Sequence, residues 1–81
     1  MRYSLTDNDK RQLDASFSYH APFGDQAERY EDIRNAAKYF ARIILTNVPR
    51  SAEMGKAMTS LREAVMFANA AIACNEKEEQ E

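Results

Sequence analysis

Two stretches of helical repeat, separated by one proline, constrain the fold of this chain more than any other feature. Apolar residues recur at alternating steps of three and four over residues 30–44 and again over residues 54–72, the spacing with which one helix packs along another. Pro49 ends the first repeat, because proline has no backbone N–H and cannot continue a helix. Since helices joined by so few residues lie antiparallel, the sequence predicts a hairpin of two long helices, over about 26–47 and 51–74. The two seams consist of Tyr30, Ile33, Ala37, Phe40 and Ile44, and of Met54, Met58, Leu61, Val65, Ala68 and Ile72.

A shorter helix is predicted ahead of the hairpin, over about residues 7–16. Thr6 is suited to cap it, and the acidic residues that follow suit the positive end of the helix dipole. A helix of this length is unstable alone in water. We therefore expect it to dock on the hairpin through Leu13 and Phe17.

The loop over residues 18–25, between the short helix and the hairpin, carries an unusual number of rings for a connection. It combines three rings with two residues that interrupt regular structure, namely Tyr19, His20, Phe23, Pro22 and Gly24. At its end, Asp25 and Glu28 have the spacing of a capping box, in which two side chains satisfy backbone groups at a helix start. The sequence therefore predicts that a capped helix begins directly behind this loop.

The length of 81 residues allows one domain, which we place at residues 1–75, followed by an acidic, disordered tail at residues 76–81. The net charge of −2 argues against general DNA or RNA binding, which needs a basic surface. The N-terminus has no apolar signal segment, and no run is long enough to span a membrane. We therefore expect a cytoplasmic protein with no membrane partner, and the single cysteine fits such a reducing compartment.

No combination of residues suited to catalysis is apparent in the sequence. The one histidine and the one cysteine, His20 and Cys74, are 54 positions apart and predict neither a nucleophile with its base nor a metal site. No glycine-rich loop that could cradle a phosphate occurs. We expect a protein that is not an enzyme and has no cofactor and no metal.

Both long helices carry more apolar surface than a single hairpin can cover. Beyond its seam, the first adds Tyr39, Ala41, Ile43 and Leu45, and the second adds Ala57, Ala64, Met66, Phe67, Ala70, Ala71 and Ala73. Small side chains on the second helix allow another helix to approach closely. The sequence therefore predicts a homo-oligomer in which hairpins pack on one another. The alternative is a wide apolar stripe that the N-terminal helix covers within one chain.

A basic stripe lies along the first long helix, because cations four residues apart share one helix face. It consists of Arg34, Lys38 and Arg42, with Arg29 about one turn earlier. Such a stripe can hold phosphates by charge-assisted hydrogen bonds. Alternatively it is a solvated face, partly neutralised by Glu31 and Asp32.

The rings just upstream of this stripe favour a ligand that carries a base as well as phosphate. Tyr19 and His20 could stack on such a base, a contact worth about 1–3 kcal/mol. Other roles remain open for the rings, since His20 could bond to the backbone and Phe23 could plug the end of the hairpin. On the second long helix, Arg62 and Asn69 could either reach a ligand or bond across a subunit interface.

Four motifs in one order over residues 17–75 resemble a known family: Tyr19-His20-x-Pro22, Arg29-Tyr30-x-x-Ile33-Arg34, Pro49-x-Ser51 and Leu61-Arg62-Glu63-Ala64-Val65-Met66-Phe67-Ala68-Asn69-Ala70-Ala71-Ile72-Ala73. The chain resembles the helical-hairpin family of phage anti-defence proteins. These are sponges that sequester the cyclic-nucleotide messengers of the bacterial CBASS and Thoeris systems. The resemblance implies interlocked homohexamers in the host bacterial cytoplasm, which bind the messengers without degrading them.

The resemblance to the anti-CBASS branch also implies roles for particular residues. It places a base-stacking tyrosine at Tyr19 and a phosphate-binding cation at Arg34. It places the threonine and arginine of a cyclic-trinucleotide site at Ala36 and Ala70, neither of which can form the hydrogen bonds of that site. The anti-Thoeris branch usually carries an N-terminal β domain, which has no counterpart in this sequence.

We therefore expect a non-enzymatic, homo-oligomeric sponge for cyclic oligonucleotides, with cyclic dinucleotides favoured. Tyr19 would stack on the base and Arg34 would bind phosphate, and the further candidates are His20, Arg29 and Lys38. The alternatives are a sponge for cyclic ADP-ribose isomers and a protein-interaction module built on the helical hairpin.

Overall fold

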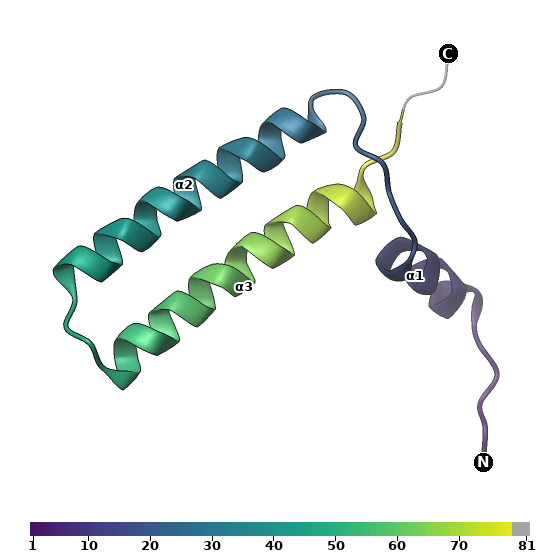
Figure 1. Ribbon diagram of the computed structural model, residues 1–81. Helices are drawn as coiled ribbons and strands as arrows, with labels where there is room; N and C mark the ends of the chain where they lie inside the picture. The colour runs from purple at the N-terminus through teal and green to yellow at the C-terminus, as the bar shows by residue number, and fades with distance from the viewer. Residues whose placement is uncertain (79–81) are drawn as a thin grey trace.

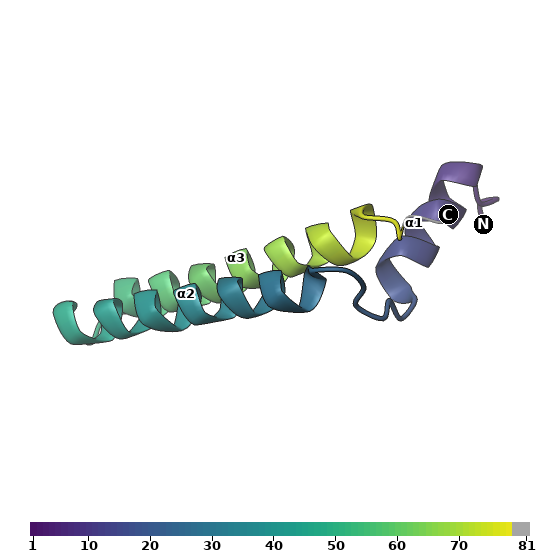
Figure 2. The same ribbon diagram turned by 90° about the horizontal axis from the view of Figure 1, so that it is seen from above.

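A computed structural model describes residues 1–78 and contains three helices, with no strand in that range. They are α1 (Asp7–Phe17), α2 (Gln26–Asn47) and α3 (Ala52–Asn75). Helices α2 and α3 run antiparallel side by side, and α1 lies beyond the open end of the hairpin that they form (Figures 1 and 2). The molecule is flat, with extents of 49 × 45 × 13 Å. The prediction of an all-α hairpin preceded by a short helix is confirmed.

Side-chain caps fix the starts of α1 and α3. Thr6 and Asp9 form a reciprocal capping box, in which each side chain accepts a hydrogen bond from the other residue's backbone N–H, at 2.9 and 3.0 Å. Ser51 accepts a hydrogen bond from the backbone N–H of Met54 at 3.1 Å. These bonds satisfy donors that the first turn of a helix leaves without a partner. Pro49 stands in the short connection between α2 and α3, which ends the first helix as predicted.

The capping box predicted for Asp25 and Glu28 is wrong. The backbone of Asp25 is not in the extended conformation of the other two caps, and its side chain forms no capping bond. Its carboxylate instead accepts from Nε of Arg29 at 3.1 Å. The turn before it depends on Gly24, whose φ of 57° lies in the left-handed region.

Helix α1 docks on α3. Phe17 remains 83% exposed, so docking through its ring is wrong, whereas Leu13 remains 45% exposed and its part in the docking stays a prediction. The contact includes the backbone carbonyl of Ala15, which accepts from Sγ of Cys74 at 3.0 Å. Within residues 1–78, α1 packs on α3 alone and does not cover the apolar faces of the hairpin.

No apolar side chain in residues 1–78 is buried, which is unusual for a folded domain. Large side chains on every helix are exposed, among them Phe17, Tyr39, Phe40, Met66 and Phe67. The seam between α2 and α3 is only half-buried, since two helices offer no second layer to cover it. This surface is the basis of the predicted homo-oligomer, which stays a prediction.

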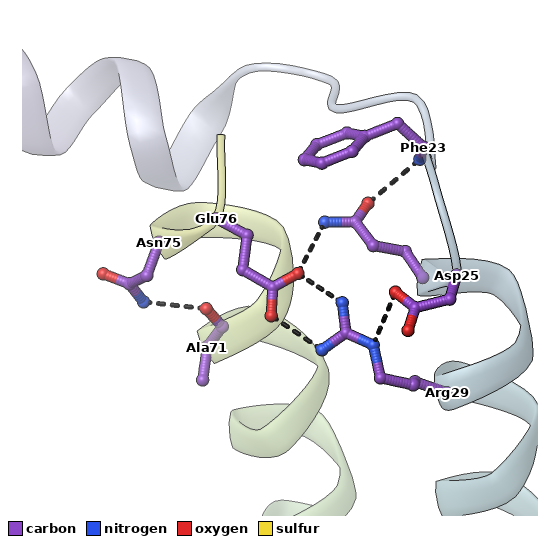
Figure 3. Close-up of polar contacts among 7 residues, drawn as sticks. Phe23, Asp25, Arg29, Ala71, Asn75 and Glu76 are labelled. Atoms are coloured by element: carbon purple, nitrogen blue, oxygen red, sulfur yellow. Dashed lines mark hydrogen bonds and ion pairs between the residues drawn. The ribbon is translucent and has the colours of Figure 1, made fainter. Parts of the chain in front are cut away.

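The acidic tail predicted over residues 76–81 is described only in part, because residues 79–81 lie outside the described residues. Glu76, the first residue of that stretch, bonds to side chains of α2 (Figure 3). The division into a domain and a disordered tail stays a prediction.

Candidate functional site

Arg34, the strongest candidate for binding a phosphate, lines an open hollow between the first half of α2 and the last turns of α3. The hollow has a volume of about 420 Å³ and is lined from α2 by Tyr30 and Arg34 and from α3 by Asn69, Ala70 and Ala73. Arg34 is exposed and forms no ion pair and no hydrogen bond within residues 1–78. Its guanidinium is therefore free to bind an anion through two parallel hydrogen bonds, as a bidentate ligand.

Asn69 of α3 lines the same hollow and carries an acceptor that is unsatisfied within the described residues. Its Oδ1 is buried and has no hydrogen-bond partner in residues 1–78. A buried acceptor without a donor costs free energy, so natural proteins usually pair it. The sequence left open whether Asn69 reaches a ligand or bonds across a subunit interface, and the structure places it in the same hollow as Arg34.

Lys38 lies at a second hollow farther along the hairpin. That hollow, of about 290 Å³, also contains Arg62 of α3. Arg34 and Lys38 are four residues apart and share one side of the seam. The structure thus adds a cation from α3 to the basic stripe, whereas sequence periodicity alone showed only the cations of α2.

The opposite side of the seam is apolar. Ile33, Ala36 and Phe40 of α2 face Leu61, Ala64 and Ala68 of α3 across a hollow of about 340 Å³. The 100° step between helical residues turns these positions of α2 away from Arg34 and Lys38. The hairpin therefore has a basic side suited to an anion and an apolar side suited to helix packing.

Tyr19 is exposed on the loop before α2 and does not line the hollow of Arg34 in the same chain. Its side chain is 88% exposed. One chain therefore does not bring together the two residues that the resemblance marks as ligand-binding.

Arg29 is held in an ion-pair network (Figure 3). Its Nε donates to Asp25 at 3.1 Å, and its Nη1 donates to Glu76 at 2.7 Å. Nη2 donates to the other carboxylate oxygen of Glu76. Hydrogen bonds from Arg29, and next from Gln26, lower the pKa of the Glu76 carboxyl from 4.5 to about 2, and those with Glu76 and Asp25 raise the pKa of Arg29. A ligand phosphate would have to displace a carboxylate to reach this guanidinium.

His20 and Cys74 meet at one backbone group despite their distance in the sequence. Nε2 of His20 lies 2.8 Å from the carbonyl oxygen of Ala15, which also accepts from Sγ of Cys74. Since a carbonyl only accepts, Nε2 carries the proton in this contact. Because Nε2 of His20 already carries a proton, it cannot take the proton of the Cys74 thiol.

Gln26 is a residue that the sequence reasoning missed. It is 3% exposed and is the one buried polar residue in the described range. Its Oε1 accepts from the backbone N–H of Phe23, and its Nε2 donates to Glu76, both at 3.1 Å. The sequence did contain a signal for this contact. The two long helices are predicted to have nearly equal lengths, so in an antiparallel hairpin the start of the first lies opposite the end of the second.

A comparison with protein families decides what kind of hairpin this is. The family model described as "Acb2/Tad1, hairpin domain" matches residues 9–73, which include all three helices for most of their length. The chain belongs to the Acb2/Tad1 hairpin-domain family. No curated protein and no solved structure gave a match.

Membership in the Acb2/Tad1 hairpin-domain family confirms the resemblance drawn from the four motifs. It supports a general role as a phage anti-defence sponge that binds cyclic nucleotides. The family is one of binding proteins rather than enzymes. None of the helices in residues 1–78 combines the length and the apolar character that crossing a bilayer requires.

Proposed function

We propose that this protein sequesters cyclic dinucleotides in the cytoplasm of the infected bacterium without cleaving them. The observation that carries the proposal is the guanidinium of Arg34, unpaired within residues 1–78, in a hollow that Asn69 also lines, in a chain of the Acb2/Tad1 hairpin-domain family. A cyclic dinucleotide presents both a phosphate for the cation and a base edge for the amide. Capture alone suffices for such a role, because lowering the free messenger concentration silences its receptor by mass action.

We further propose that the working form is a homohexamer, and that Tyr19 and Arg34 of different chains meet at each ligand. The exposed ring of Tyr19 does not line the hollow that contains the exposed guanidinium of Arg34. The apolar side of the hairpin, with Ala36 and Ala64 at its hollow, offers close packing to other hairpins. Assembly through that side would leave the basic side open to ligands, with His20, Arg29 and Lys38 as further ligand contacts.

Binding without cleavage is consistent with how the two most reactive side chains are engaged. His20 and Cys74 both lie against the carbonyl of Ala15. A nucleophile needs a base within hydrogen-bond reach, and this arrangement does not supply one to the thiol. Return of intact ligand from the heat-denatured complex, identified by mass spectrometry, would test the point.

Calorimetric titration tests the proposed ligand. The panel should contain cyclic dinucleotides, cyclic trinucleotides and cyclic ADP-ribose isomers. We expect the tightest binding with a cyclic dinucleotide, and a loss of at least about a hundredfold in Arg34→Glu, which replaces a charge-assisted bond by repulsion. Arg50→Glu is the matched control, because it makes the same charge change at the far end of the hairpin, between α2 and α3.

Each outcome of this titration has one meaning. Heat only from the cyclic ADP-ribose isomers would overturn the dinucleotide preference and support the anti-Thoeris alternative. No heat from any compound would overturn the sponge and leave the protein-interaction module. Equal affinities in Arg34→Glu and Arg50→Glu would refute the assignment of Arg34.

A further inference from the structure

We infer that Gln26 and Glu76 are positioning residues that hold the aromatic loop, and with it Tyr19, ready for the ligand. The inference rests on the proposed function, in which Tyr19 stacks on a base. It assigns a role to a contact between the first residue of α2 and the residue directly behind α3.

The loop over residues 18–25 is tied to the end of α3 from both sides. On its C-terminal side, Phe23 donates its backbone N–H to Gln26, which donates to Glu76 (Figure 3). On its N-terminal side, the carbonyl of Ala15 accepts from Cys74. Tyr19 lies between these two ties. Its own side chain is 88% exposed, so the ties rather than its own packing set its position.

The amide of Gln26 fits this task in one orientation only. A backbone N–H can only donate, so Oε1 must face Phe23 and Nε2 must face the carboxylate of Glu76. The side chain is 3% exposed, so water cannot readily replace either partner. Both carboxylate oxygens of Glu76 also accept from Arg29, which fixes the plane of the carboxylate.

A loop held in its binding position loses little freedom when a ligand arrives. If the ties open, the loop samples other positions, and apparent affinity falls in proportion to the competent fraction. A loop that is competent for about a tenth of the time would bind about tenfold more weakly. The position of Tyr19 would then depend on the hydrogen bond between Gln26 and Glu76, although neither residue contacts the ligand.

Gln26→Glu breaks the central link while preserving the local helix start. The new carboxylate still accepts from Phe23, but it cannot donate to Glu76 and repels it. An acid in the first turn of a helix is favourable, so we expect α2 to tolerate the change. The exchange variant Gln26→Glu/Glu76→Gln restores one donor and one acceptor at this contact and keeps the net charge of the natural chain, but a glutamine at position 76 can accept from Arg29 through one atom only.

The experiment measures cyclic dinucleotide affinity by calorimetry for the natural chain and for four test variants: Gln26→Glu, the exchange variant, Tyr19→Ala, and Tyr19→Ala combined with Gln26→Glu. Gln12→Glu, on the exposed surface of α1, controls for the added charge. We expect about a tenfold loss in Gln26→Glu, recovery of part of that loss in the exchange variant, natural affinity in Gln12→Glu, and no further loss when Gln26→Glu is added to Tyr19→Ala.

The outcomes separate this inference from the proposed function. If the natural chain binds and Gln26→Glu binds equally well, the positioning role is refuted and the sponge stands. The same holds if the exchange variant fails to recover affinity although it stays folded by circular dichroism, or if the losses in Tyr19→Ala and Gln26→Glu simply add. If the natural chain binds no cyclic nucleotide, the proposed function fails first and this inference falls with it.

Discussion

Dilution should unfold this protein, because the single chain lacks a closed core. No apolar side chain in residues 1–78 is buried, and aromatic residues on every helix are exposed. If hairpins supply that core to one another, unfolding is coupled to dissociation and the melting temperature depends on concentration. A chain that folds alone melts at the same temperature at any concentration.

The size of the effect follows from the length of the chain and the number of subunits. Unfolding entropy near the transition is roughly 2.1 cal/mol/K per residue, or roughly 170 cal/mol/K for the 81 residues. Tenfold dilution of a hexamer lowers its stability per chain by five-sixths of about 1.4 kcal/mol, which is about 1.2 kcal/mol. The melting temperature should therefore fall by about 7 °C per tenfold dilution, and by about 4 °C for a dimer.

Circular dichroism at 222 nm, followed on heating at concentrations from about 1 to about 100 µM, measures this slope. Light scattering at the same concentrations gives the mass independently. A melting temperature constant to about 1 °C over that range, together with a monomer mass, would refute the reasoning from the exposed apolar surface.

Three further predictions concern single contacts. Ser51→Ala removes the side chain that accepts from the N–H of Met54, so it should cost about 1 kcal/mol in a urea titration and leave the concentration dependence of the melting temperature unchanged. An altered dependence would show that Ser51 acts between chains. Gly24→Ala should cost about 1 kcal/mol through its φ of 57° alone, since nothing lies within 4 Å of an added Cβ, and equal urea midpoints would contradict this. The pKa of Glu76 lies below its ordinary 4.5 in the folded protein, so the unfolded chain binds more protons between pH 4.5 and about 2. The natural chain should therefore melt at a higher temperature than Glu76→Gln above pH 4.5, and this difference should vanish as the pH falls through about 2. A difference that persists at that acid pH would show that the bonds of ionised Glu76 to Arg29 and Gln26 are not its cause.

The candidate site was predictable only as far as single residues on single helices. Periodicity placed Arg34 and Lys38 on one face of the first long helix, and in the structure each lines a hollow between α2 and α3. Their part in ligand binding stays a prediction. Periodicity did not show that Asn69 and Arg62 of α3 join them, because spacing along one helix carries no information about which residues of another helix lie opposite. Nor did it show that Arg29 is occupied by Glu76, 47 residues away.

The sequence by itself determined the three helices and the turn between the long ones. Caps such as Thr6 and Ser51, the break at Pro49 and the apolar repeat all act over a few residues, so they can be read without knowing the rest of the fold. The tertiary structure alone decided that the end of α3 returns to the start of α2. There Gln26 meets Glu76, 50 residues away, and the loop that carries Tyr19 is tied down. Such contacts depend on how two helices align in space, and no local pattern of residues encodes them.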